Sequence, residues 1–292
     1  MNTQNETAVI YTLIAEADDD DLCILADYVT DRGEGRLSLS NDVCKLLVQC
    51  RDNVSFGASA RRTLADEILK FGGNTLTNFY REMRTSMGLG SLLDKILPDA
   101  TPTISYDEIV RDVASHMKVS SGKHDRVEDI EASIIRHLMG ESLKKMDSET
   151  ARKVTKDLGG SFSIAAPATA AATLAMGGVA GFATYRMAMI VANSVARTLT
   201  GRGLELAANA AITRTLGMVL GPIGWAVAGL WTLADLSSPA YRVTVPCVVQ
   251  LAYMRLKMVN KFKVTVCEPC GAFIDRHARF CPSCGHANEV TA

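Results

Sequence analysis

Aromatic residues are scarce in this chain of 292 residues: they make up 6% of it, whereas all hydrophobic residues together make up 48%. The apolar content is therefore mostly Ala, Leu, Val, Ile and Met, which favours close-packed helices over a sheet-rich domain. Residues 1–157 contain no clear strand pattern and no internal repeat. This composition predicts an all-α fold, and the length allows two or three structural units.

Catalytic motifs are also lacking. His116, His124 and His137 are the only histidines before the C-terminal segment, and none lies in an HExxH, HxxxH or nucleophile-elbow setting. Glu128 and Glu131 fall on helix faces that we expect to be solvated. We therefore expect an interaction domain without enzymatic activity.

A secretory signal is not evident, because the N-terminus has no basic region and soon becomes acidic. Four of the eight cysteines are scattered through apolar patterns and four cluster near the end. This distribution is typical of a reducing compartment, with buried thiols and one metal site, so we expect a cytoplasmic protein.

Charge is distributed unevenly along the chain. Residues 1–157 hold 27 acidic and 20 basic residues, a net charge of −7, whereas residues 158–292 hold 5 and 11, a net charge of +6. Two explanations remain open: the basic part docks on the acidic part, or it is attracted to an anionic membrane or to nucleic acid.

Apolar residues recur at helical spacing through the acidic region, residues 1–157. The aspartates at 18–21 are expected to be a solvated cap that complements a helix dipole. The glycines at 72–73 are expected to end one helix, and Asn74 to cap the next. Residues 105–108, Ser-Tyr-Asp-Glu, are typical of a capping box.

Residues 158–240 carry only six formal charges. Within them, residues 215–234 are 20 uncharged residues that include Trp225 and Trp231, the only tryptophans. A helix of that length spans about 30 Å, the hydrocarbon thickness of a bilayer, and tryptophans are common interfacial anchors. Two glycine pairs have the spacing that allows close helix packing: Gly177 with Gly181, and Gly217 with Gly221.

Three interpretations of residues 158–240 remain open. They form a membrane hairpin, or helices that emerge conditionally from a soluble core, or simply the core of a helical bundle that Pro222 kinks. Arginines in the connector between the two apolar runs oppose the positive-inside tendency and argue against a permanent hairpin.

A helix is expected from Pro246, in its first turn, to about Val259. Arg255, Lys257 and Lys261 lie on its polar side. This pattern predicts an amphipathic helix with a basic edge, which suits either a membrane surface or docking on the acidic helices.

The strongest signal is a pair of CxxC motifs, formed by Cys267 with Cys270 and Cys281 with Cys284. Four thiolates at this spacing are typical of a closed, tetrahedral, structural Zn²⁺ site. Glycine follows the second cysteine of each pair, at Gly271 and Gly285, where a tight turn favours a residue without a side chain.

The segments 263–266 and 278–280 are the expected strands of a small hairpin around the metal. Arg276 and Arg279 at its tip are candidate contacts for a protein partner. Nucleic acid is the less favoured partner, because two arginines are a small basic footprint.

Two segments resemble a known family. Residues 71–78 read FGGNTLTN and residues 238–246 read SPAYRVTVP; both resemble the YaaW-like family of enterobacterial proteins, whose function is unknown. The similarity extends from the acidic run to about residue 258. The resemblance implies a bacterial, largely helical protein, and it identifies no active-site residue in this chain. The C-terminal cysteine segment is a departure from the short members of the family.

We therefore predict an all-α helical protein with a small C-terminal β-hairpin zinc ribbon. Its expected parts are an acidic helical domain (1–157), a glycine- and alanine-rich hydrophobic region with the basic helix (158–262), and the four-cysteine zinc ribbon (263–292). The leading functional hypothesis is conditional association with the inner membrane, with homo-oligomer formation, as a stress or phage-defence effector. The alternative is a soluble chaperone-like or adaptor protein whose ribbon binds protein or nucleic acid.

Overall fold

The computed structural model describes residues 3–36, 39–87, 104–157, 182–204, 240–260, 264–270, 273–281 and 284–287, and these are mostly helical, as predicted. The helices are α1 (Thr3–Glu16), α2 (Asp19–Thr30), η1 (Asp31–Gly33), α3 (Asn41–Asp52), α4 (Ala58–Met87), α6 (Tyr106–His116), α7 (Val127–Lys144), α8 (Ser148–Asp157), α10 (Phe182–Thr200) and α12 (Tyr241–Asn260). Two short strands follow, β1 (Val264–Val266) and β2 (Phe273–Asp275).

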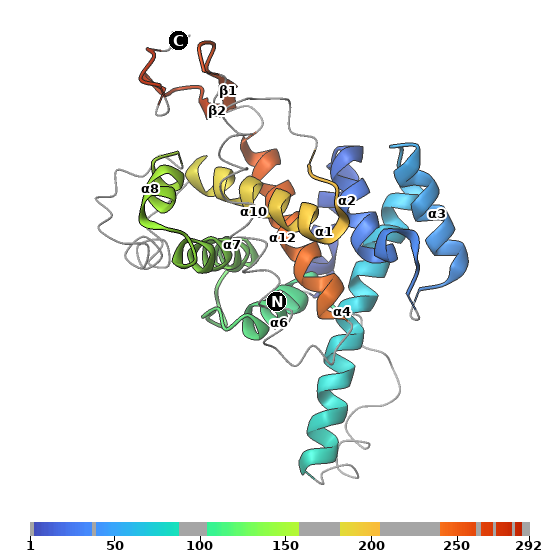
Figure 1. Ribbon diagram of the computed structural model, residues 1–292. Coiled ribbons are helices and arrows are strands. Elements are labelled where there is room, and N and C mark those ends of the chain that lie inside the picture. Colours follow the sequence, from blue (N-terminus) through green and yellow to red (C-terminus); the bar gives the residue numbers. More distant parts are fainter. Residues whose placement is uncertain are drawn as a thin grey trace.

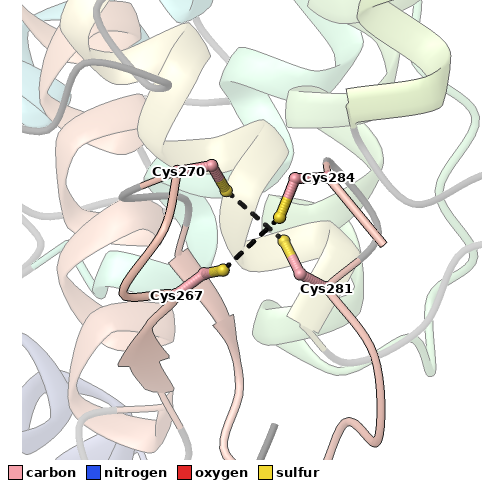
Figure 2. Close-up of side chains that lie close together, drawn as sticks. All are labelled: Cys267, Cys270, Cys281 and Cys284. Atoms are coloured by element: carbon pink, nitrogen blue, oxygen red, sulfur yellow. Dashed lines mark hydrogen bonds between the residues drawn. The ribbon is translucent and has the colours of Figure 1, made fainter. Parts of the chain in front are cut away.

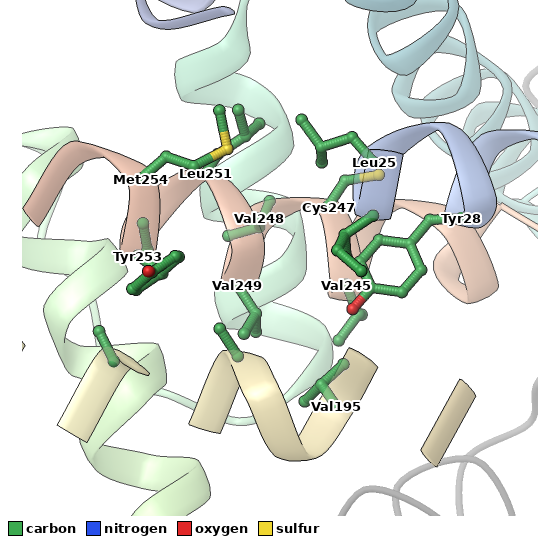
Figure 3. Close-up of a cluster of buried hydrophobic side chains, with 14 of the residues drawn as sticks. Leu25, Tyr28, Val195, Val245, Cys247, Val248, Val249, Leu251, Tyr253 and Met254 are labelled. Atoms are coloured by element: carbon green, nitrogen blue, oxygen red, sulfur yellow. The ribbon is translucent and has the colours of Figure 1, made fainter. Parts of the chain in front are cut away.

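The helix α12 lies at the centre of the helical body (Figure 1). It contacts α10 along one side and α1, α2, α4, α6 and α7 on its others. Every residue from Val243 to Met254 is buried, and Figure 3 shows its side chains meeting Leu25 and Tyr28 of α2 and Val195 of α10. The predicted amphipathic pattern is therefore wrong for most of this helix, which is surrounded on all sides as a core helix is.

This arrangement gives one hydrophobic core that includes residues from both sides of position 157. Side chains of α1 to α8 share it with α10 and α12. A separate, smaller cluster contains Cys267, Ile274 and Cys281.

The start of α12 also differs from the prediction. The helix begins at Tyr241, so that Pro246 lies inside it and not in its first turn. The Ala240 carbonyl accepts hydrogen bonds from the Val243 and Thr244 amides, which begins the helix earlier. Pro246 removes only the bond to the Arg242 carbonyl, near the exposed end of the helix.

Basic residues near the end of α12 pair with acidic residues of the N-terminal helices. Arg255 Nε lies 2.8 Å from Glu131 Oε2, and Lys257 Nζ lies 2.8 Å from Asp18 Oδ2 and 2.7 Å from Asp21 Oδ2. Of the two roles expected for this basic edge, docking on the acidic helices is therefore the one observed within the chain.

The same contacts overturn the expected solvation of Glu131 and of Asp21. The sequence places Glu131 on a solvated face and the aspartates at 18–21 in a solvated cap, but Glu131 and Asp21 are 2% and 4% exposed. Asp18 and Asp20 are exposed, and the run supplies the acidic first turn of α2, as expected. Asp18 makes no side-chain capping bond to α2. Periodicity within one helix cannot reveal that a cation 124 or 236 residues later along the chain will meet these carboxylates.

The predicted break at residues 72–73 is wrong, since α4 runs through both glycines. A Cβ at Gly72 would lie 2.4 Å from Cγ1 and Cδ1 of Ile109 in α6. Gly72 is thus required for the close approach of two helices, and not for a helix end.

The predicted capping box is confirmed, and a second local cap accompanies it. Ser105 and Glu108 form the predicted capping box at the start of α6, with the Ser105 amide donating to Glu108 Oε2 at 2.8 Å. Asp147 accepts hydrogen bonds from the Glu149 and Thr150 amides and so caps α8. Short-range hydrogen bonds of this kind depend on neighbouring residues alone.

The strands β1 and β2 pair antiparallel, with Val264 opposite Asp275 and Val266 opposite Phe273. The first strand agrees with the prediction, but the second does not coincide with the expected segment 278–280. The chain turns back directly after the first cysteine pair, which places Ile274 in the small cysteine cluster. Phe280 instead forms an isolated bridge with Ala287.

Candidate metal centre

Two tight turns present the four predicted cysteine ligands. Cys267 follows β1 directly, and the turn that comes next ends at Cys270. In the second turn the Gly285 amide donates to the Cys281 carbonyl at 2.8 Å, and the Cys281 amide donates to the His286 carbonyl at 2.8 Å. Gly285 has a φ of +77°, which is the left-handed conformation that glycine adopts without strain. This agrees with the prediction that the tight turn favours a residue without a side chain. Gly271 lies outside the described residues.

The four sulfur atoms lie within 4.8 Å of one another (Figure 2). Cys267 Sγ is 3.6 Å from Cys284 Sγ, and Cys270 Sγ is 3.6 Å from Cys281 Sγ. Each of these contacts joins one CxxC motif to the other. Cys267 and Cys281 are buried, Cys270 is half-buried and Cys284 is exposed.

These distances fit a metal better than any disulfide. A sulfur–sulfur bond is about 2.05 Å long, much shorter than the 3.6 Å separations here. Four sulfurs placed tetrahedrally at the Zn–S distance of about 2.3 Å would be separated by about 3.8 Å. Desolvation raises the pKa of the Cys267 thiol. The four residues therefore suit a tetrahedral metal ion.

The candidate partner contacts lie beside this cluster on the turn after β2. Arg276 and Arg279 are both exposed, as is His277, whose amide donates to Asp275 Oδ1 at 2.8 Å and orders the turn. Phe280 is 64% exposed and lies between Arg279 and the candidate ligand Cys281. Phe280 was not identified from the sequence as a candidate contact residue, because this residue was assigned to a strand. The position of Phe280 directly before a cysteine of the CxxC motif was the signal that could have identified it.

The other predicted site residues lie outside the described residues: Gly177, Gly181, Gly217, Gly221, Trp225 and Trp231. Entry of residues 215–234 into a membrane therefore stays a prediction. Within the part of the chain that the structure describes, no helix combines the length and the apolar character needed to cross a bilayer.

Similarity to known proteins covers about two thirds of the chain. A UPF0174 protein of Helicobacter pylori strain J99 is 36% identical over 196 residues, which are 66% of this chain and 70% of the relative. The chain belongs to the UPF0174 family. A second member, from H. pylori strain 26695, is 30% identical over 206 residues, 68% of this chain and 90% of the relative.

Membership confirms the resemblance to YaaW. The UPF0174 protein YaaW of Escherichia coli K12 is 26% identical over 204 residues, 69% of this chain and 73% of the relative. No family model matches the chain, and no solved structure matches it. The family name states no activity, so functional inference for this UPF0174 protein rests on its own residues.

Proposed function

We propose that Cys267, Cys270, Cys281 and Cys284 bind one structural Zn²⁺ ion and that the protein is a non-catalytic adaptor. The observation that carries the first part is the 3.6 Å spacing of the sulfurs across the two CxxC motifs. Sulfur ligands select zinc over hard cations such as Mg²⁺ and Ca²⁺. Four protein ligands leave no position for water or substrate, so such a site holds structure and does not perform hydrolysis.

Metal content tests the zinc site. Protein purified without chelator is expected to contain about one zinc per chain, measured by elemental mass spectrometry. Cys281→Ser should lose the metal, whereas Cys44→Ser, which changes a half-buried cysteine outside the cluster, should keep it. A zinc content near zero in the parent protein, or an equal content in both variants, would contradict the proposal.

The adaptor role rests on the surface that the cysteine cluster holds in place. Phe280 is 64% exposed and has Arg279 beside it and Arg276 on the same turn. An exposed aromatic ring with adjacent guanidinium groups is the composition of a protein-binding hot spot. The proposed partner is a protein with an acidic surface, since the turn contributes two arginines.

A binding comparison tests this role. Parent protein, Phe280→Ser and Arg279→Gln are each used to recover partners from bacterial cells by affinity purification with quantitative mass spectrometry. A partner that the parent recovers and both variants lose supports the adaptor role. Single-stranded oligonucleotides titrated into the same three proteins test the alternative partner. If the parent protein binds them and both substitutions abolish this binding, the surface is assigned to nucleic acid and a protein partner is contradicted.

A second candidate function, conditional membrane association, rests on the 20 uncharged residues at 215–234. Because Trp225 and Trp231 are the only tryptophans, tryptophan fluorescence, excited at wavelengths where tyrosine does not absorb, reports on this segment alone. Anionic vesicles should shift the emission to shorter wavelength if the segment inserts, and neutral vesicles serve as the control. An unchanged spectrum, with no flotation of the protein with vesicles, would contradict insertion.

A further inference from the structure

A polar pocket of about 290 Å³ lies where the end of α2, the end of α10 and the start of α12 meet. Arg32 and Arg36 reach it from the segment after α2, and Arg242 from the start of α12. Asp27 and Asp31 also line it. Three arginines from two distant parts of the sequence therefore line one small cavity.

The carboxylates do not balance these charges. Asp27 Oδ1 is already bound by Arg51 at 2.7 Å, and Asp31 Oδ1 lies 3.6 Å from Arg36. Among the described residues, the side chains of Arg32 and Arg242 have no carboxylate partner within 4.0 Å. The pocket therefore retains an excess of positive charge.

Two residues that line the pocket, Tyr28 and Arg36, each have a buried polar atom that lacks a partner within the described part of the chain. The Tyr28 hydroxyl and Arg36 Nε make no hydrogen bond there, although Tyr28 is only 3% exposed. Figure 3 shows the Tyr28 ring extending from α2 toward α10, with its hydroxyl at the far end. A buried donor without an acceptor costs about 1–3 kcal/mol, so both atoms favour an incoming acceptor.

The guanidinium groups of Arg36 and Arg242 also repel each other. Burial lowers the pKa of Arg36, and the positive charge of Arg242 lowers it further, while Asp31 opposes both effects. An anion between the two groups would relieve this repulsion.

We propose that this pocket binds a phosphate group, with Arg36, Arg242 and Arg32 as its cationic contacts and the Tyr28 hydroxyl as a further donor. Guanidinium groups donate paired hydrogen bonds that match phosphate oxygens. The volume is at the lower limit of small-molecule sites, which suits a phosphomonoester better than a dinucleotide. The group comes either from a soluble metabolite or from a phosphomonoester lipid headgroup. This site is independent of the cysteine cluster.

Calorimetric titration with inorganic phosphate, at constant ionic strength set by chloride, tests the pocket in the full-length protein. Arg242→Gln should weaken phosphate binding by about tenfold, the usual loss for one charge-assisted hydrogen bond. Arg126→Gln is the matched control, because Arg126 is an exposed arginine just before α7, outside the pocket; the phosphate affinity of this variant should equal that of the parent. Vesicles containing phosphatidic acid distinguish the lipid source from the soluble one.

Tyr28→Phe separates a binding role from a structural one. The substitution removes a buried hydroxyl that has no partner, so the unfolding temperature without phosphate should not fall. Phosphate affinity should nevertheless decrease and the stabilisation by phosphate should shrink. If neither phosphate nor phosphatidic acid vesicles bind, or if the parent, Arg242→Gln and Tyr28→Phe bind them equally, the proposal is overturned.

Discussion

Arg255 and Glu131 form a two-point ion pair at the centre of the helical body. Arg255 donates from Nε at 2.8 Å and from a terminal nitrogen at 3.1 Å, one bond to each carboxylate oxygen of Glu131. The Tyr106 hydroxyl adds a third hydrogen bond to Glu131 at 2.7 Å. This network joins α6, α7 and α12, so the charges fix how three helices meet.

Arg255→Met is expected to destabilise the protein by about 3–5 kcal/mol, because it leaves the Glu131 carboxylate buried without its cation. Denaturant unfolding followed by circular dichroism measures the loss. Adding Glu131→Gln to Arg255→Met should recover part of the stability, since the uncompensated charge is gone. Lys153→Met, which removes an exposed pair with Glu149, should leave the free energy of unfolding nearly unchanged, because solvent screens such pairs.

Gly72→Ala should destabilise the protein by about 1–3 kcal/mol through overpacking, although alanine is the better helix former. The new Cβ would lie 2.4 Å from the Ile109 side chain. Gly73→Ala is the control in the same helix, because its Cβ would meet only the terminal Cδ1 of Ile104, at 3.3 Å. Thermal unfolding of both variants measures the effect. The close-approach role would be refuted if Gly72→Ala and Gly73→Ala lowered the unfolding temperature equally. It would also be refuted if adding Ile109→Ala did not raise the unfolding temperature of Gly72→Ala.

Stability is expected to fall as the pH decreases through about 6.5 and on toward the lower pKa values that the two histidines have in the folded state. Burial lowers the pKa of both His116 and His137 below the usual value of 6.5. The unfolded chain then takes up protons before the folded one, and folding is disfavoured at low pH. His116 stacks on Tyr241 with ring centroids 3.8 Å apart, so His116→Phe keeps a stacked ring. Unfolding free energies from pH 8 to 6 should vary less in this variant than in the parent.

Chelation of the proposed zinc ion should leave the helical body folded. Cys267, Ile274 and Cys281 belong to a hydrophobic cluster separate from the main core. We therefore expect the far-ultraviolet circular dichroism and the main thermal transition to remain nearly unchanged after zinc removal, while limited proteolysis begins after Asn260. A collapse of the helical signal on chelation would show that the cluster supports the whole molecule.

Features set by neighbouring residues could be predicted from the sequence. The capping box at Ser105 and Glu108 depends on a span of four residues and was found where expected. The meeting of the two cysteine pairs was also predicted, and their four sulfurs do lie together. The spacing within each pair is a local feature, and only one longer-range contact, between the two turns, had to be assumed.

Features set by contacts between distant residues could not be predicted. A glycine inside a helix and one that ends a helix look alike in sequence, and only Ile109 on α6 distinguishes them at Gly72. Glu131 has the spacing of a surface residue until Arg255 reaches it. The pocket around Arg36 and Arg242 was missed for the same reason, since no motif joins its two halves.

The position of α12 has a consequence for synthesis. The N-terminal helices are complete by Asp157, but the helix that they surround is made only later in the chain. At about 5–20 residues per second, the apolar faces of α1, α2 and α7 wait on the order of ten seconds for Val243 to Met254 to leave the ribosome. During that interval they are candidate clients for chaperones, and truncation before residue 240 would leave them permanently exposed.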